Sequence, residues 1–248
     1  MKKTLLLVVA FATMILGLSS CEKTSNGDIS YSKIAWGILH YINGNYLVYS
    51  DADQNYYVTN VDEFASNVFP ERKNKRVLIG YNELDDIDPS KSYYVPMAAA
   101  NKNIDLVMFL PFVTAKDGIL FSSEMDEEDL TAMGDDPLTV KDVSFGQGYI
   151  NIGFDVLYNS AANEQHKLTL IYNDNPDDAD GKYHLWLMHN AFTDVNGLQK
   201  MYTYSTFDLD EVIPDEETSA DIVLHWYDFT SEVDKTVVEW KKEYTYQK

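Results

Sequence analysis

Cysteine is almost absent from this chain, because Cys21 is the single cysteine among 248 residues. An intrachain disulfide is therefore excluded, and so is a zinc site built on pairs of cysteines. A chain of this length can bury a core large enough to fold without such crosslinks. The residues around Cys21 must then show what this one cysteine is for.

Basic residues are also scarce, with 19 Lys and Arg against 40 Asp and Glu and a formal net charge of −21. Residues 1–20 hold two lysines and no acid, so their removal would bring the charge to −23. Nucleic-acid binding depends on Lys and Arg that neutralise phosphates, and anionic membranes attract polybasic segments. The one basic cluster, Arg72–Arg76, is interpreted as a solvated loop that leads into a strand. We therefore expect no nucleic-acid partner and no electrostatic attachment to a membrane.

Standard catalytic motifs are missing as well. The sequence contains no G-x-S-x-G, no H-E-x-x-H and no P-loop. A hydrolase that uses two carboxylates needs no such motif, so this class stays open. The sequence names no catalytic residue and predicts no cofactor.

Long apolar runs are lacking except at the start of the chain. Two lysines precede the run Leu5–Leu18, which is too short for the roughly 20 residues that span a bilayer. A charged start, a short apolar middle and small residues before a cut are typical of a secretory signal peptide. Leu18-Ser19-Ser20-Cys21 resembles a bacterial lipobox, in which cleavage precedes the cysteine and the cysteine carries lipid. We predict a signal peptide over 1–20, lipidation at Cys21 and a polar tether over 21–30.

The residue pattern over 31–117 is typical of short strands. One face of Lys33–Ile42 carries, at period two, Ile34, Trp36, Ile38, His40 and Ile42, and Asn43-Gly44 after it is a strong hairpin signal. Further strands are predicted at Tyr46–Tyr49, Tyr56–Thr59, Arg76–Asn82 and Ile104–Phe112, with one short helix at Val61–Val68. Three strands, a helix and two strands are the element order of an OB-fold, a five-stranded Greek-key barrel.

The second half predicts another β domain. Residues 118–136 are rich in Ser, Glu and Asp and are predicted to be a linker with a short helix at Glu127–Met133. Seven strands are predicted within 137–248, at Thr139–Phe145, Tyr149–Tyr158, Lys167–Tyr172, Tyr183–His189, Met201–Phe207, Ala220–Tyr227 and Lys235–Tyr244. Seven short alternating strands indicate a β-sandwich. The predicted fold class is all-β, an OB-like barrel followed by a seven-stranded sandwich.

Histidine spacing argues against a zinc site. His184 and His189 are five residues apart in one strand, so their side chains leave opposite faces and do not readily share one ion. Because His189 shares the face of Leu185 and Leu187, it is interpreted as a strand-end histidine bound to backbone.

Asn173–Gly181 is the strongest candidate for a metal-binding loop in the sequence, because it carries Asp174, Asp177, Asp178 and Asp180. Calcium prefers six to eight oxygen ligands, which clustered carboxylates can supply. The spacing fails the EF-hand pattern, since Pro176 would hold the first ligand position and Leu187 the twelfth. A solvated hairpin turn is the alternative interpretation, and we expect no tight calcium binding here.

The abundant aromatic residues allow two interpretations. They could form a platform that stacks on sugar rings, or they could simply follow the preference of Tyr and Trp for strands. The candidates are Tyr56, Tyr57, Tyr93, Tyr94, Tyr202, Tyr204, Trp226, Tyr227 and Trp240.

Several segments together resemble a known family. They are the lipobox, Arg76–Leu84, Asp136–Val140, Gly148–Phe154 and Leu187–Ala191. In these the chain is similar to the NigD-like lipoproteins of Bacteroidetes. The resemblance implies an N-terminal OB domain, a C-terminal β-sandwich domain and, through the link of the family name to a bacteriocin locus, an immunity role. It supplies no catalytic residues, and the short stretch Glu22-Lys23-Thr24 lacks the acidic run typical of surface-displayed members.

The sequence therefore predicts a lipid-anchored lipoprotein of the cell envelope, at the outer membrane, facing either the periplasm or the exterior. Its predicted role is to bind or protect something without catalysis, and its partner would be an envelope protein or a glycan. A glycan-binding lipoprotein is the first alternative, and a two-carboxylate hydrolase is the second.

Overall fold

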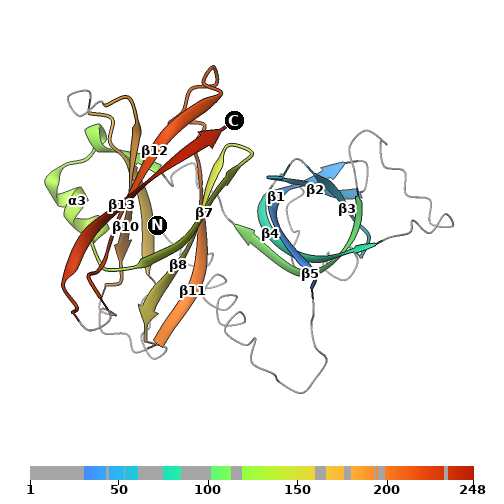
Figure 1. Cartoon of the computed structure of the whole chain (residues 1–248), viewed down its shortest axis with the longest axis horizontal. Helices are drawn as coiled ribbons and strands as arrows, with labels where there is room; N and C mark the ends of the chain where they lie inside the picture. The colour runs from blue at the N-terminus through green and yellow to red at the C-terminus, as the bar shows by residue number, and fades with distance from the viewer. Residues whose placement is uncertain are drawn as a thin grey trace, which may run out of the picture. The chain divides into compact units, whose positions relative to one another are not determined.

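The computed structural model describes residues 31–42, 45–52, 54–60, 75–84, 102–112, 119–159, 166–175, 180–192, 194, 199–231 and 234–248. The predicted signal peptide, Cys21, the tether and the Val61–Val68 helix lie outside these residues. The described chain divides into two compact units, one over 29–115 with 145–150, and one over 116–144 and 151–247 (Figure 1).

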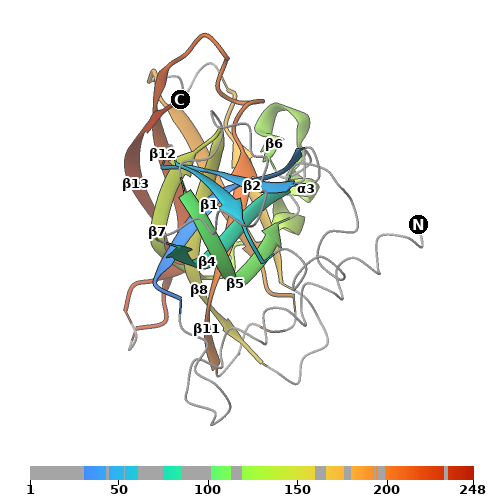
Figure 2. The ribbon, with the colours of Figure 1, turned by 90° about the vertical axis from the view of Figure 1, so that its right-hand side faces the viewer.

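The first unit is a closed five-stranded barrel, seen end-on in Figure 1 and from the side in Figure 2. Its strands are β1 (Lys33–Ile42), β2 (Asn45–Ser50), β3 (Asn55–Val58), β4 (Lys75–Leu84) and β5 (Lys102–Phe112). They run in the order β1-β2-β3-β5-β4, and β1 closes onto β4. Because β3 and β5 pair in parallel while the other neighbours are antiparallel, this is the OB order, and the predicted barrel is confirmed.

Alternating side chains of these strands fill the barrel. Leu39, Val48, Val58, Val77 and Ile79 are each at most 2% exposed. The hydroxyl of Tyr81 donates a hydrogen bond of 2.9 Å to the hydroxyl of Tyr56, so both buried phenols are satisfied. Burial and this bond raise the pKa of Tyr81.

Arg76 and Asp51 form a charged pair outside this core. Arg76 is 2% exposed, and both of its terminal nitrogens donate to the carboxylate of Asp51. The guanidinium also lies over the Trp36 ring, 5.4 Å from the ring centroid. The strand expected to begin at Arg76 is present as β4, and the charge of Arg76 is already matched within the fold. Residues 72–74 of the basic cluster lie outside the described residues.

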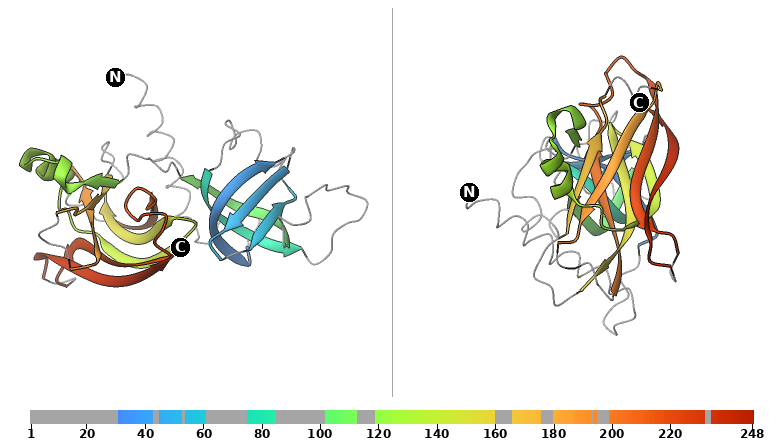
Figure 3. Two further views of the ribbon diagram at one scale, coloured as in Figure 1. Left: turned by 90° about the horizontal axis from the view of Figure 1, so that it is seen from above. Right: turned by 90° about the vertical axis from the view of Figure 1, so that its left-hand side faces the viewer.

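The second unit is a sandwich of two sheets (Figure 3). The larger sheet has the order β13-β12-β10-β9-β6 and the smaller the order β11-β8-β7. The strands are β6 (Ile119–Phe121), β7 (Thr139–Gly146), β8 (Tyr149–Tyr158), β9 (Lys167–Tyr172), β10 (Tyr183–Asn190), β11 (Gln199–Asp208), β12 (Ser219–Phe229) and β13 (Val237–Gln247). All seven predicted strands are present, and β6 adds an eighth among the described residues.

The prediction of a linker over 118–136 is wrong for residues 119–136. β6 pairs in parallel with β9, a 3-10 turn follows at Ser122–Glu124, and α3 (Glu127–Met133) packs against β9 and β10. The predicted helix is confirmed, and its N-cap Asp126 accepts hydrogen bonds from the Glu128 and Asp129 amides. The strand was missed because three residues carry little periodicity and the partner strand lies about fifty residues later.

Candidate functional site

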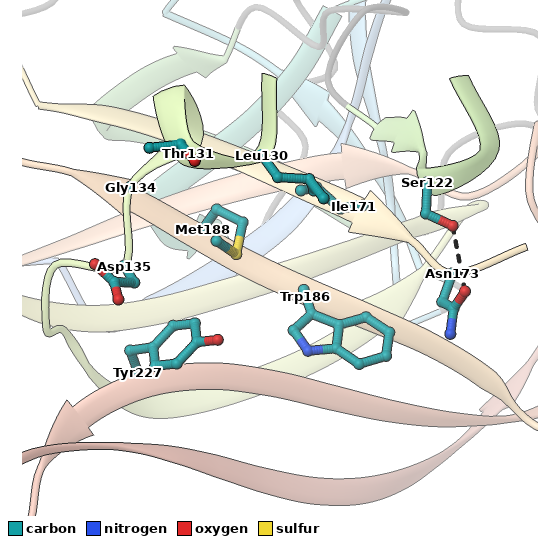
Figure 4. A pocket seen from close by; sticks show the side chains of 10 residues that line it. All are labelled: Ser122, Leu130, Thr131, Gly134, Asp135, Ile171, Asn173, Trp186, Met188 and Tyr227. Carbon is teal, nitrogen blue, oxygen red and sulfur yellow. Dashed lines mark hydrogen bonds between the residues drawn. The ribbon is translucent and has the colours of Figure 1, made fainter. Parts of the chain in front are cut away.

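The outer face of the larger sheet carries a groove beneath α3 (Figure 4). Side chains alternate along β10, so Leu185 and Leu187 enter the core while Trp186 and Met188 point outward. Strand register places Ile171 opposite Trp186, and Tyr227 lies further along β12. Together with Leu130 of α3 these side chains line a cavity of about 520 Å³, a size suited to a small ligand.

Polar groups stand at both ends of this groove. In Figure 4 Ser122 and Asn173 lie at one end, Asp135 and Tyr227 at the other, and the Trp186 indole between them. The Ser122 hydroxyl lies 3.2 Å from the Asn173 side-chain oxygen and 2.9 Å from the Asp174 carboxylate. Burial, and then the charges of Glu239 and Asp135, raise the pKa of Tyr227, so its hydroxyl is protonated at neutral pH.

Three of these polar groups have no hydrogen-bond partner within the described part of the chain. They are the indole N–H of Trp186, the hydroxyl of Tyr227 and the carboxylate of Asp135. All three belong to residues that water can reach, so solvent satisfies them when the groove is empty. The groove thus presents one donor, one group that donates or accepts, and one acceptor.

A chain of paired imidazoles lies beside the groove. His225 of β12 stacks on the Trp186 indole with ring centroids 4.1 Å apart and planes 10° apart. His225 Nδ1 is 2.7 Å from Glu239, and its Nε2 is 2.9 Å from Nδ1 of His184. The other nitrogen of His184 is 3.2 Å from Asp180. From Glu239 to Asp180 the groups therefore follow in the order carboxylate, imidazole, imidazole, carboxylate.

Counting protons assigns the state of this chain. Its three contacts need three N–H hydrogens, whereas two neutral imidazoles carry two. The chain as a whole therefore needs one hydrogen more than two neutral imidazoles supply. Burial lowers the pKa of His225, although the Glu239 hydrogen bond opposes this.

A second chain of the same kind lies on the core side. His189 is 2% exposed and its Nδ1 contacts the Asp136 carbonyl at 3.2 Å, which confirms a strand-end histidine bound to backbone. Its Nε2 is 3.0 Å from His166, which in turn contacts Asp194 at 3.1 Å. Burial, and then the nearby His166, lower the pKa of His189 to about 4.

The aspartates of the candidate calcium loop have structural partners where they are described. Asp174 accepts from the amide and hydroxyl of Ser123 and the hydroxyl of Ser122; these bonds outweigh desolvation and lower its pKa. Asp180 accepts from the Lys182 amide and contacts His184. Asp177 and Asp178 lie outside the described residues. Within the described residues no three His, Cys, Asp or Glu side chains gather as metal ligands.

The predicted aromatic platform is divided among several places. Tyr56, Tyr57 and Trp226 are buried, while Tyr93 and Tyr94 lie outside the described residues. Tyr202 is 38% exposed, stacks edge-on with Tyr204 and donates to Asp142, and Trp240 is 45% exposed. Of the candidates that the structure describes, only Tyr227 lines the groove.

Sequence reasoning missed Trp186 and His225. The alternation His184, Trp186, Met188 against Leu185, Leu187 could have placed Trp186 on the outer face. Only the parallel register of β10 and β12, which sets Trp186 opposite His225, brings these rings together.

Comparison with known proteins identifies the second unit. Residues 121–240 match the model of the NigD-like C-terminal beta sandwich domain. A search of curated proteins gave no match. Among the described residues, no helix is long and apolar enough to cross a membrane.

Solved structures share the fold over most of the chain. A NigD-like immunity protein from Bacteroides caccae has a TM-score of 0.63 at 16% identity, covering 86% of this chain and 96% of that one. A protein of unknown function, DUF1344, from Bacteroides vulgatus has a TM-score of 0.58 at 19% identity, with coverage of 86% and 90%. A candidate lipoprotein from Bacteroides fragilis has a TM-score of 0.54 at 12% identity, with coverage of 85% and 97%. The family match confirms the resemblance seen in the sequence for residues 121–240, a NigD-like C-terminal β-sandwich domain, and the solved structures share the fold of the chain.

Proposed function

We propose that this protein is a lipid-anchored lipoprotein of the outer membrane that acts by binding, in a protective role of the immunity kind. The observation that carries the binding function is the groove beneath α3. It combines an outward indole with a hydroxyl and a carboxylate, and among the described residues neither these two groups nor the indole N–H has a hydrogen-bond partner; this is the composition of a recognition site.

The groove supports binding better than hydrolysis. Asp135 is the one carboxylate among its described lining residues, whereas glycoside hydrolysis by paired acids needs two that flank the scissile bond. Other described carboxylates near the sheet are engaged: Asp174 by serines, Asp194 by His166 and an amide, and Glu239 by His225.

Two relatives support the location and the protective role. The Bacteroides caccae protein is described as a NigD-like immunity protein, and the Bacteroides fragilis protein as a candidate lipoprotein. For this chain, the lipobox that ends at Cys21 supports the anchor. A lipidated cysteine with two or more acyl chains holds a protein far more firmly than a single chain does.

Expression in a bacteriocin-sensitive Bacteroides host tests both the lipid anchor and the protective role. The wild-type chain should incorporate labelled palmitate and raise survival in supernatants of bacteriocin-producing strains. Cys21→Ala should abolish labelling and reduce survival, while the tether variant Ser25→Ala should change neither. Palmitate in the Cys21→Ala variant would refute the anchor, and unchanged survival with the wild-type chain would refute the protective role.

A further inference from the structure

We propose that the groove beneath α3 binds one uncharged sugar ring of a glycan, with the apolar face of the ring against Trp186. This proposal rests on the binding function proposed above and names its ligand class. Three observations carry it: the stacking surface of the indole, the three polar groups that have no partner among the described residues, and the charge of the groove.

The indole offers a single surface for stacking. His225 covers one face of Trp186 at a centroid distance of 4.1 Å, so a ligand can reach only the opposite face and the edge. Met188 and Leu130 border the same space (Figure 4). The C–H groups on one face of a pyranose suit an aromatic face, whose electron density is negative. The stacked imidazole also holds the indole in place, so little side-chain freedom is lost on binding.

The polar groups match the hydroxyls of a sugar. The Asp135 carboxylate accepts, the Trp186 N–H donates, and the Tyr227 hydroxyl does either. Figure 4 shows the Tyr227 hydroxyl directed toward the indole nitrogen, with Asp135 on the far side of the phenol. A sugar ring carries several hydroxyls that both donate and accept, whereas a purely apolar ligand would leave these groups desolvated and unpaired.

The charge of the groove disfavours acidic sugars. The described lining residues contain Asp135 and no Lys, Arg or His. Tyr227 also feels the negative field of Glu239 and Asp135. A uronic or sialic acid would bring a carboxylate into this field with no cation to balance it, at a cost in free energy. The cavity of about 520 Å³ has room for one or two rings.

Affinity electrophoresis of the mature, detergent-solubilised protein tests the proposal. Gels would contain starch, mannan or mixed-linkage β-glucan as neutral polymers, and polygalacturonate as the acidic one. At least one neutral polymer should retard the wild type, and polygalacturonate should not. Titration with the oligosaccharide of the retarding polymer then gives the affinity of each variant.

The variants separate stacking from hydrogen bonding. Trp186→Ala should weaken binding about tenfold or more, since it removes the stacking surface. Tyr227→Phe and Asp135→Asn keep size and should each weaken binding about fivefold. The matched control is Trp240→Ala, because Trp240 is exposed and outside the groove, and it should bind like the wild type. Circular dichroism confirms that each variant is folded.

Several results would overturn the proposal. They are no retardation of the wild type by any neutral polymer, stronger retardation by polygalacturonate, or equal losses in Trp240→Ala and Tyr227→Phe. Survival of the Bacteroides host separates this proposal from the function on which it rests. Protection without sugar binding would refute the sugar site alone, and sugar binding without protection would refute the protective role alone.

Discussion

The buried His189 ring couples the stability of the sandwich to pH. Its pKa of about 4 in the folded chain lies below the 6.5 of an unperturbed histidine, so between these values the unfolded chain binds one more proton. Stability from this residue is fully present above about pH 6.5 and is lost as pH falls toward 4. The lowered pKa of His225 acts in the same direction.

We therefore expect the free energy of unfolding to fall between pH 7 and pH 4, with His189 contributing about 3 kcal/mol of the loss. Urea unfolding at several pH values, followed by fluorescence, measures this slope. His189→Gln should be less stable at pH 7 but should show a shallower slope, because the titrating group is gone. An identical slope in both proteins would show that His189 does not carry the effect.

The buried pair of Arg76 and Asp51 gives a second prediction at this scale. Replacing Arg76 by Ala removes the guanidinium that donates to the Asp51 carboxylate, and the Asp51 side chain is only 13% exposed. We expect a loss of about 3–5 kcal/mol in the stability of the barrel, measured by urea unfolding. Lys33→Ala is the control, since the Lys33–Glu83 pair is exposed and should contribute little. Equal losses in the two variants would contradict this account.

At the scale of elements, β6 and α3 belong to the sandwich and not to a linker. β6 extends the sheet beyond β9, and α3 covers part of β9 and β10. Without them the edge of β9 would expose unpaired backbone groups and the apolar side chain of Ile171.

We predict that a fragment over 116–248 is more stable than a fragment over 137–248. The shorter fragment begins at the domain boundary that was expected from the sequence. The measurement is the urea midpoint of each fragment, together with gel filtration to detect association through the bared edge. The shorter fragment should unfold at lower urea or aggregate. Equal midpoints and monomeric behaviour of both would restore residues 118–136 as a dispensable linker.

At the scale of the whole molecule, charge sets the choice of partner. OB barrels that bind single strands combine a positive groove with stacking aromatics. Here Tyr56 and Tyr57 are buried in the barrel, Arg76 is neutralised by Asp51, and the net charge is −21. The OB topology therefore carries no implication of nucleic-acid binding for this chain.

We expect no binding of a labelled oligonucleotide at about 0.15 M salt, where nonspecific binders still show a Kd of roughly 10⁻⁴–10⁻⁶ M. Fluorescence anisotropy measures this directly. A salt-sensitive signal that is lost when Arg72, Lys73 and Lys75 are replaced by alanine would restore the nucleic-acid role. Arg76 is left intact in that variant, because its loss would destabilise the barrel.

The sequence alone determined the fold class and nearly every strand. The strands expected at Lys33–Ile42 and Tyr149–Tyr158 have the bounds of β1 and β8. Alternation alone did not give the buried face. In β1 the barrel core takes Leu39, with Ala35 and Tyr41 packed against it, while Ile34 is 50% exposed, and in β8 Asn151 is buried next to Ile150 and Ile152. Net charge and the single cysteine are properties of composition, and they limit the partners without any knowledge of the fold.

Tertiary structure alone decided where the site lies. Trp186 and His225 are 39 residues apart in the chain, and only the parallel pairing of β10 with β12 stacks their rings. The short β6 strand and the groove beneath α3 arise in the same way, from contacts between segments that are distant in sequence. Periodicity shows which side chains share a face, but it does not show which strand becomes the neighbour, because pairing is fixed by the packing of the whole sandwich.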